Sequence, residues 1–390
     1  MMSFEKIKEC IESKRFMIIN VIKSNNYQFD KETGKEQSFF TEIMDEVEIN
    51  LFFLKLEQII KGKNSLCFVI LNEYFFSYHL VISKKNYDFI INMCKEISKK
   101  KPNIILYINL CHETEKNNLP AEYSKKLKIY LNDIYDNDNN QIWKISSLEY
   151  SKLFKEKINN YFANETFAIM NGYILYSYKK SSYYEEIENI SNYNYIIGFG
   201  TDEINQDLNN ELKEISKYLS EKISIEICFD FQRNIKTKSF ENIILEKGDP
   251  KLNAIEELKE LRKDVKNYSE KKLIIIQSNI TNLYEQIDLL PPEVIICKCD
   301  PLQSLVFIIK DKNNINEIKY IETHYSDLIN HEKNKGLLQI NKGKRLNRAL
   351  NEFKKKCEFL NVSKLIKEFE SQKSEANIGN HHYIFFEYNI

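Results

Sequence analysis

This 390-residue chain lacks long apolar runs, a large net charge of either sign and a regular set of cysteines. No uninterrupted hydrophobic stretch approaches the roughly 18 residues that a membrane-spanning helix needs. The first fifteen residues alternate charges and contain no apolar core of signal-peptide length. We therefore expect a soluble, cytoplasmic protein that makes no membrane contact.

The charge balance excludes the commonest kind of nucleic-acid-binding protein. Lys and Arg number 56 against 57 Asp and Glu, which gives a formal net charge of -1 and no bulk attraction to nucleic acid or anionic lipid. With 43% hydrophobic and 29% charged residues, the composition is that of an ordinary globular protein. We expect a large buried core and no nucleic-acid partner.

The cysteines and histidines form no recognisable metal or disulfide pattern. Eight cysteines are scattered without a framework of spacings, which favours reduced thiols. Cys297 and Cys299 form the only close pair, and no second pair or nearby histidine completes a zinc set, so core packing is expected. The 198–200 segment lacks the third glycine of a dinucleotide loop. These patterns predict no metal and no cofactor.

Strands and helices alternate along the first third of the chain, which predicts an α/β fold. Apolar segments at 15–23, 66–71 and 104–110 are typical of buried strands, and the segments between them carry helical spacing. The first of these helices is expected at about 41–61 and the second around 89–97. In the first helix, we expect one stripe to face the core: Ile43, Val47, Leu51, Leu54 and Ile59.

The rest of the chain combines further strands with added segments. Asn171-Gly172 is a strong hairpin turn signal between strands at 166–170 and 173–178. Further strands are expected at 223–228, 273–277, 294–298 and 305–309. Segments at about 111–160 and 235–270 are interpreted as insertions within a domain of residues 1–330. An amphipathic stripe predicts a helix in a 331–390 extension, formed by Leu346, Leu350, Phe353, Cys357 and Leu360.

Three strand ends carry complementary reactive groups. Cys228 closes an apolar strand, Glu73 follows the strand 66–71, and Lys179-Lys180 follow the second hairpin arm. Open α/β sheets bind ligands at the carboxyl ends of their strands. A thiol, a carboxylate and an ammonium can supply a nucleophile, a proton shuttle and an oxyanion partner. The structural alternatives are a core thiol, a surface loop charge and an exposed strand end.

In this order the segments resemble the nitrilase superfamily, the carbon-nitrogen hydrolases. The resemblance lies in Asn72 to Phe76, in Asn164 to Lys180 with its turn and Tyr-x-Lys ending, and in the Ile-Cys-x-Asp segment Ile227 to Asp230. It covers about residues 15–325. Asn72 stands where the family usually has proline, glycines number only nine, and the spacing from Lys180 to Cys228 is generous, which indicates a divergent member.

The resemblance implies a four-layer α-β-β-α sandwich with insertions and an extra C-terminal helical segment. It also implies roles: Cys228 attacks an amide or nitrile carbon, Glu73 shuttles the proton, and Lys180 stabilises the oxyanion with the backbone N-H of Phe229. Lys179 competes with Lys180, because adjacent strand residues point to opposite faces. Some family members use a second glutamate, for which Glu185, Glu186 and Glu188 are available and Glu188 is preferred.

The resulting hypothesis is a hydrolase that cleaves a non-peptide carbon-nitrogen bond of a small amide or nitrile through a Cys thioester. Two alternatives remain. One is a catalytically inactive, nitrilase-like module that binds another protein, and the other is an acyltransferase that uses the same thioester. Proteins that resemble nitrilases often dimerise, so we expect a homodimer to which the C-terminal segment contributes.

Overall fold

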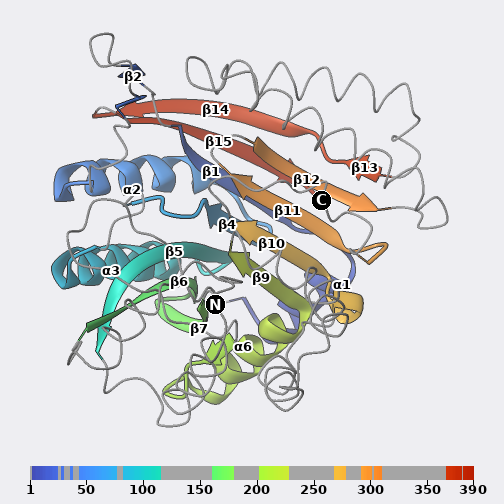
Figure 1. Cartoon of the computed structure of the whole chain (residues 1–390). Helices are drawn as coiled ribbons and strands as arrows, with labels where there is room; N and C mark the ends of the chain where they lie inside the picture. The colour runs from blue at the N-terminus through green and yellow to red at the C-terminus, as the bar shows by residue number, and fades with distance from the viewer. Residues whose placement is uncertain are drawn as a thin grey trace, which may run out of the picture.

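The chain folds around two packed β-sheets with helices on the outside (Figure 1). The computed structural model describes residues 2–24, 28–29, 36–37, 44–76, 82–115, 160–179, 202–227, 268–277, 291–300, 303–309, 366–379 and 381–390. In the described residues the two main sheets have eight and five strands, and a separate two-stranded ribbon pairs β2 (Gln28–Phe29) with β3 (Glu36–Gln37).

The larger sheet has the strand order β14-β15-β1-β4-β5-β6-β7-β8. Its strands β1, β4 and β5 are parallel neighbours, and the other pairs in the sheet are antiparallel. The bounds are β1 Met17–Ser24, β4 Cys67–Leu71, β5 Ile104–Glu115, β6 Asn160–Met170, β7 Tyr173–Lys179, β8 Asp202–Ile204, β14 Ser371–Ile378 and β15 His381–Asn389.

Two capped helices, α2 (Glu46–Ile60) and α3 (Lys84–Lys100), cover one face of the larger sheet (Figure 1). Asp45 and Ser83 are their N-caps, each accepting a backbone N-H from the first turn. Gly62, with φ at +85°, follows the end of α2 in the left-handed conformation that glycine adopts most readily. The helices and the sheet enclose an apolar cluster that includes Phe52 and Val69.

The smaller sheet packs against the other face of the larger one. Its order is β13-β12-β11-β10-β9, with bounds β9 Ile223–Ile227, β10 Leu273–Gln277, β11 Ile295–Asp300, β12 Gln303–Ile309 and β13 Ile366–Glu368. Ile18 and Phe68 of one sheet and Ile225 and Ile275 of the other share a buried cluster. Both faces of the smaller sheet are buried, since Ile274 on the opposite face is also fully covered. The α/β sandwich expected from the sequence is therefore confirmed.

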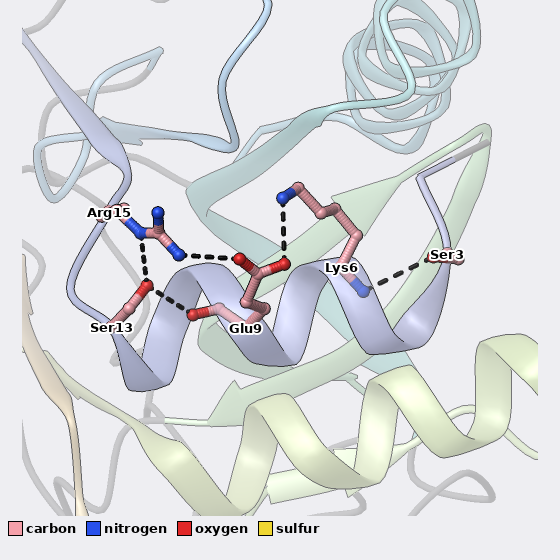
Figure 2. A network of polar contacts seen from close by, with 5 residues as sticks. All are labelled: Ser3, Lys6, Glu9, Ser13 and Arg15. Carbon is pink, nitrogen blue, oxygen red and sulfur yellow. Dashed lines mark hydrogen bonds and ion pairs between the residues drawn. The ribbon is translucent and has the colours of Figure 1, made fainter.

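Two helices, α1 (Phe4–Glu12) and α6 (Asn210–Lys222), close one side of the inter-sheet core and were not foreseen from the sequence. Figure 2 shows the exposed polar network that organises α1: Ser3 caps the helix, Lys6 and Arg15 bind the carboxylate of Glu9, and Ser13 donates to its backbone carbonyl. Exposed ion pairs of this kind contribute little to stability. A short 3₁₀ turn, Tyr268–Glu270, precedes β10.

Residues 366–379 and 381–390, the described part of the helical extension expected at 331–390, are β-structure and not helix. Strands β14 and β15 form a hairpin, and β15 pairs antiparallel with β1 over eight residues, from Met17↔Asn389 to Ser24↔His382. Figure 1 shows these red strands beside the blue β1. Tyr383 and Phe385 are buried at alternate positions, the spacing of a strand. The stripe from Leu346 to Leu360 lies outside the described residues.

Two further expectations change. Three residues of the stripe assigned to the core in α2 are exposed, since Val47, Leu51 and Leu54 are 65%, 45% and 56% exposed, whereas Phe52 and Leu56 are buried. Ile59 of that stripe is half-buried against the core, and Ile43 lies outside the described residues. The insertion expected from residue 111 starts later, because β5 and β6 stay paired out to Glu115↔Asn160. The remainder of both predicted insertions, 116–159 and 235–267, lies outside the described residues. Among the described helices, none is long and apolar enough to cross a membrane.

Candidate functional site

The carboxyl ends of strands from both sheets meet at Gln277, the last residue of β10. Its amide nitrogen donates to the carbonyl oxygen of Leu71 at the end of β4, at 2.6 Å, and to that of Tyr107 in β5, at 3.2 Å. In the smaller sheet Gln277 pairs in register with Ile227, the last residue of β9. The ends of β4, β9 and β10 therefore converge at one point between the sheets.

Glu73 lies at this convergence, two residues beyond β4. Its side chain is 1% exposed, and the side-chain amide of Asn164 in β6 donates to its Oε1 at 2.9 Å. The next residue, Tyr74, has φ at +55°, a left-handed conformation unusual for a bulky residue. The Tyr74 N-H is held by Oδ1 of Asn109 at 3.0 Å. The loop is thus fixed on both sides of the carboxylate.

A continuous buried network links Glu73 to Gln277 through three side chains. Asn109 Nδ2 donates to Asn164 Oδ1 at 2.6 Å and to Thr166 Oγ1 at 3.3 Å. The Thr166 hydroxyl donates to Gln277 Oε1 at 2.6 Å. All five side chains are buried, and such networks rigidify a core because each partner is costly to lose.

Asn72, the residue before Glu73, supports the same loop. Its Oδ1 accepts the backbone N-H of Lys23, at 3.2 Å, and its Nδ2 donates to the backbone carbonyl of Glu73, at 2.7 Å. A proline could make neither contact. Asn72 therefore ties the loop that bears Glu73 to the end of β1.

A second polar cluster lies on the opposite, helix-covered face of the larger sheet. His112 Nε2 is 2.9 Å from Glu165 Oε2, and Lys179 Nζ is 4.0 Å from Glu165 Oε1. Burial raises the pKa of the Glu165 carboxyl, but the hydrogen bond from His112 and the charge of Lys179 outweigh it, so this pKa lies below its ordinary value. Tyr87 of α3 packs on the His112 ring, with centroids 4.7 Å apart.

The described cysteines are packed core groups. Six of them are free and buried: Cys10, Cys67, Cys94, Cys111, Cys297 and Cys299. Burial raises the pKa of the Cys297 thiol to about 12, and burial also raises the pKa of Cys299. The sequence-based expectation of core packing for this pair is confirmed. Within the described segments, no three His, Cys, Asp or Glu side chains are grouped to hold a metal ion.

Of the residues predicted from the sequence, Glu73 is the one that the structure describes at the site. Lys180, Cys228, Glu188 and Phe229 lie outside the described residues. Their described neighbours end two of the strands, Lys179 in β7 and Ile227 in β9. Their roles stay predictions.

Sequence reasoning missed the amide and hydroxyl residues that hold Glu73. A signal for them exists, because Asn109 interrupts an apolar run in β5, Asn164 and Thr166 lie between two apolar runs of β6, and Gln277 ends the apolar β10. Buried polar groups in strands need partners, so several of them in neighbouring strands indicate a shared network.

No protein-family profile matches the sequence, and no curated protein matches it. Structural comparison finds similarity to nitrilase-superfamily proteins. One is Saccharomyces cerevisiae Nit3, a member of branch 10 of the superfamily, at 11% identity and a TM-score of 0.32, covering 75% of this chain and 82% of that one. Another is a carbon-nitrogen hydrolase from Helicobacter pylori, at 11% identity and a TM-score of 0.33, with the same coverage.

A third similar structure is a glutamine-dependent NAD(+) synthetase from Cytophaga hutchinsonii, at 11% identity and a TM-score of 0.36. This chain is covered over 76% of its length but spans only 39% of that larger protein. The nitrilase superfamily, which is named among these matches, is also the family that the sequence motifs resemble. At such identities and TM-scores the likeness says nothing about activity, so the chemistry rests on the residues of this chain.

Proposed function

We propose that the protein is a thiol-dependent hydrolase that cleaves a non-peptide carbon-nitrogen bond of a small amide or nitrile. The observation that carries the proposal is the environment of Glu73. Its carboxylate is buried, is held by Asn164, and lies where β4 and β10 end. The paired strand β9 ends there as well, and Cys228 is the next residue in the sequence.

In the proposed reaction, Glu73 accepts the proton of the Cys228 thiol as the sulfur attacks the substrate carbon. A free thiol is mostly protonated at neutral pH, so a nearby base is needed for efficient attack. For an amide, Glu73 then returns the proton to the leaving nitrogen, and ammonia or an amine departs from a thioester. Water, activated by the same carboxylate, would hydrolyse the thioester and release the thiol.

Lys180 is assigned to the oxyanion, together with the backbone N-H of Phe229. The position of Lys179 supports this choice, because its ammonium lies by Glu165 on the helix-covered face, whereas Glu73 is bonded from the inter-sheet side through Asn164. Loss of an oxyanion partner typically costs about 10²- to 10³-fold in rate. Glu188 remains the candidate for a substrate-positioning carboxylate.

Ammonia release from a panel of primary amides and nitriles tests the proposal. We expect release from at least one compound by the wild-type protein and none by Cys228→Ala. Cys10→Ala is the matched control, since Cys10 is a thiol in α1 that packs in the core, and its removal should leave turnover unchanged.

Ammonia release that persists in Cys228→Ala would contradict the assignment of Cys228 as the nucleophile. Hydroxylamine added as an acceptor separates the acyltransferase alternative. Hydroxamate formation without release of the free acid would favour transfer over hydrolysis. No reaction with any compound, together with unreactive cysteines, would favour the inactive interaction module.

A further inference from the structure

The buried network fixes which atom of each amide is the donor, because both of its ends are backbone groups whose hydrogen-bonding role cannot change. At one end, Gln277 faces the carbonyl oxygens of Leu71 and Tyr107, which only accept. Its nitrogen must therefore face them, so Oε1 faces Thr166. The Thr166 hydroxyl then donates to Gln277, and its oxygen accepts from Asn109.

The other end leads to the same assignment independently. The backbone N-H of Tyr74 only donates, so it fixes the atom of Asn109 that it meets as Oδ1. Asn109 therefore presents Nδ2 to Asn164, and Asn164 meets it with Oδ1. The remaining atom of Asn164, its Nδ2, must then face Glu73. Both ends of the network thus turn an N-H donor toward Glu73 Oε1.

We infer that Asn164 is a positioning residue that keeps Glu73 Oε1 as a hydrogen-bond acceptor and directs proton exchange to Oε2. Asn109 acts through Asn164, because its hydrogen bond to Asn164 Oδ1 sets the orientation of the Asn164 amide. The hydroxyl oxygen of a protonated carboxyl is a poorer acceptor than its carbonyl oxygen, so the donor at Oε1 favours a proton on Oε2. This inference rests on the proposed function, in which Glu73 is the base.

The proton transfer balances without any further reactant. For an amide, the S-H bond of Cys228 breaks, an O-H bond forms at Glu73 Oε2, and the electron pair of sulfur forms the S-C bond while the carbonyl π pair moves onto oxygen. The C=O bond then re-forms, the C-N bond breaks, and the proton on Oε2 passes to the leaving nitrogen. Asn164 keeps its own N-H throughout, so it orients the carboxyl and exchanges no proton.

The test measures the alkylation rate of Cys228 by iodoacetamide between pH 4 and pH 9, with the labelled peptide mapped by mass spectrometry. In Asn164→Asp, a carboxylate oxygen replaces the donor at Glu73 Oε1. Two carboxylates at that distance do not both ionise readily, so the pair retains a proton to higher pH. We expect the midpoint of the pH-rate profile to rise by about one pH unit or more.

Asn109→Asp tests this orienting contact without touching Glu73. An aspartate there still accepts from Tyr74 but has no donor for Asn164, so the amide of Asn164 is driven to turn its oxygen toward Glu73. The midpoint should rise in the same direction, by a smaller amount. Asn20→Asp is the matched control, because Asn20 is a buried amide between the sheets that bonds Lys298 O and Ser304 Oγ instead. Its midpoint should equal that of the wild type.

A purely structural role for Asn164 would lower stability and activity but leave the midpoint in place. The inference is overturned if Glu73→Gln changes the profile while Asn164→Asp and Asn109→Asp keep the wild-type midpoint. If Glu73→Gln also leaves the profile unchanged, Glu73 is not the base and the proposed function fails first. Either aspartate variant suffices for the decision if the other does not fold.

Discussion

At the scale of single residues, the candidate site depends on buried polar side chains within apolar stretches of strand. Four of these side chains are fully buried and hydrogen-bond to one another in one chain: Asn164, Asn109, Thr166 and Gln277. A buried group that loses its partner costs the full desolvation of that group, about 1–3 kcal/mol. The network is therefore sensitive to single changes that keep the shape of a side chain.

Thr166→Val removes the hydroxyl between Asn109 and Gln277 at almost constant volume. We expect the free energy of unfolding to fall by about 1–3 kcal/mol, because Gln277 Oε1 stays buried and loses its donor. Urea denaturation measures this. Ser220→Ala is the control, since the Ser220 hydroxyl bonds the carbonyl of Lys217 within α6, and we expect it to cost less. Equal losses in the two variants would contradict a special role for the network.

The pH dependence of stability should contain a contribution from Glu165. Its pKa is lowered in the folded protein, because His112 and Lys179 outweigh the effect of burial. A lowered pKa stabilises the fold above the unfolded-state pKa of about 4.3, and this stabilisation is lost as the pH falls through the folded-state value. Glu165→Gln should therefore destabilise the protein at pH 7 and less at pH 3.5. A difference that is equal at both pH values in urea denaturation would contradict this.

At the scale of elements, α2 shows where sequence patterning stops being decisive. The helix is apolar on much of its surface, so both the stripe with Val47 and Leu51 and the stripe with Phe52 and Leu56 satisfy helical spacing. Packing against the sheet and against Phe75 selects the second stripe. The existence and the extent of the helix could be predicted from its own sequence. Which of its faces is buried depends on contacts with the sheet, which the sequence of the helix alone does not reveal.

Two leucines in α2 give a matched test of this orientation. Leu54 is 56% exposed and Leu56 is fully buried. Leu56→Ala should cost about 2–5 kcal/mol of unfolding free energy, as core truncations do. Leu54→Ala should change it by about 0.5 kcal/mol or less. Chemical denaturation of the two variants measures both values, and the reverse ranking would mean that the helix is turned the other way.

At the scale of the whole molecule, the C-terminal hairpin completes the larger sheet. β15 pairs with β1 from the other end of the chain, and Tyr383 packs on Phe52 at a ring distance of 5.4 Å. Strand pairing between segments so far apart in sequence leaves no local signal, and β14 is polar along most of its length. For this reason the tail could not be assigned to the sheet from the sequence.

Deletion of residues 366–390 should therefore abolish cooperative folding, because β1 loses its neighbour and the core loses Tyr383 and Phe385. Circular dichroism during thermal unfolding measures this. Lys373→Ala, on the exposed strand β14, is the control and should unfold as the wild type does. A deleted protein with an unchanged cooperative transition would show that the hairpin is an appendage.

We propose a homodimer for the full chain, as expected from the family resemblance. Light scattering should give about twice the 46.5 kDa chain mass. A monomer mass at micromolar concentration would contradict it. Tail deletion cannot identify the interface, since part of the tail belongs to the central sheet.

A site residue could be predicted from the sequence where an apolar strand and the residues directly after it identify its position. It could not be predicted where its role depends on residues that folding brings together from distant parts of the chain. Glu73 follows an apolar strand in a loop whose flanking residues are readable in the sequence. Asn164 holds it from a strand 91 positions later, and Gln277 completes the network from the other sheet. No local pattern indicates which of many asparagines makes that contact.

The proposed hydrolase requires that Glu73 activates Cys228. This is measured by the iodoacetamide labelling rate of each cysteine, mapped by mass spectrometry, in the wild type and in Glu73→Gln. Six cysteines are buried in the core, and burial raises the pKa of Cys94 and Cys299 among them, so they should react slowly. We expect Cys228 to be labelled first in the wild type and at least about tenfold more slowly in Glu73→Gln. Labelling that is fastest at another cysteine, or a Cys228 rate unchanged by Glu73→Gln, would contradict it.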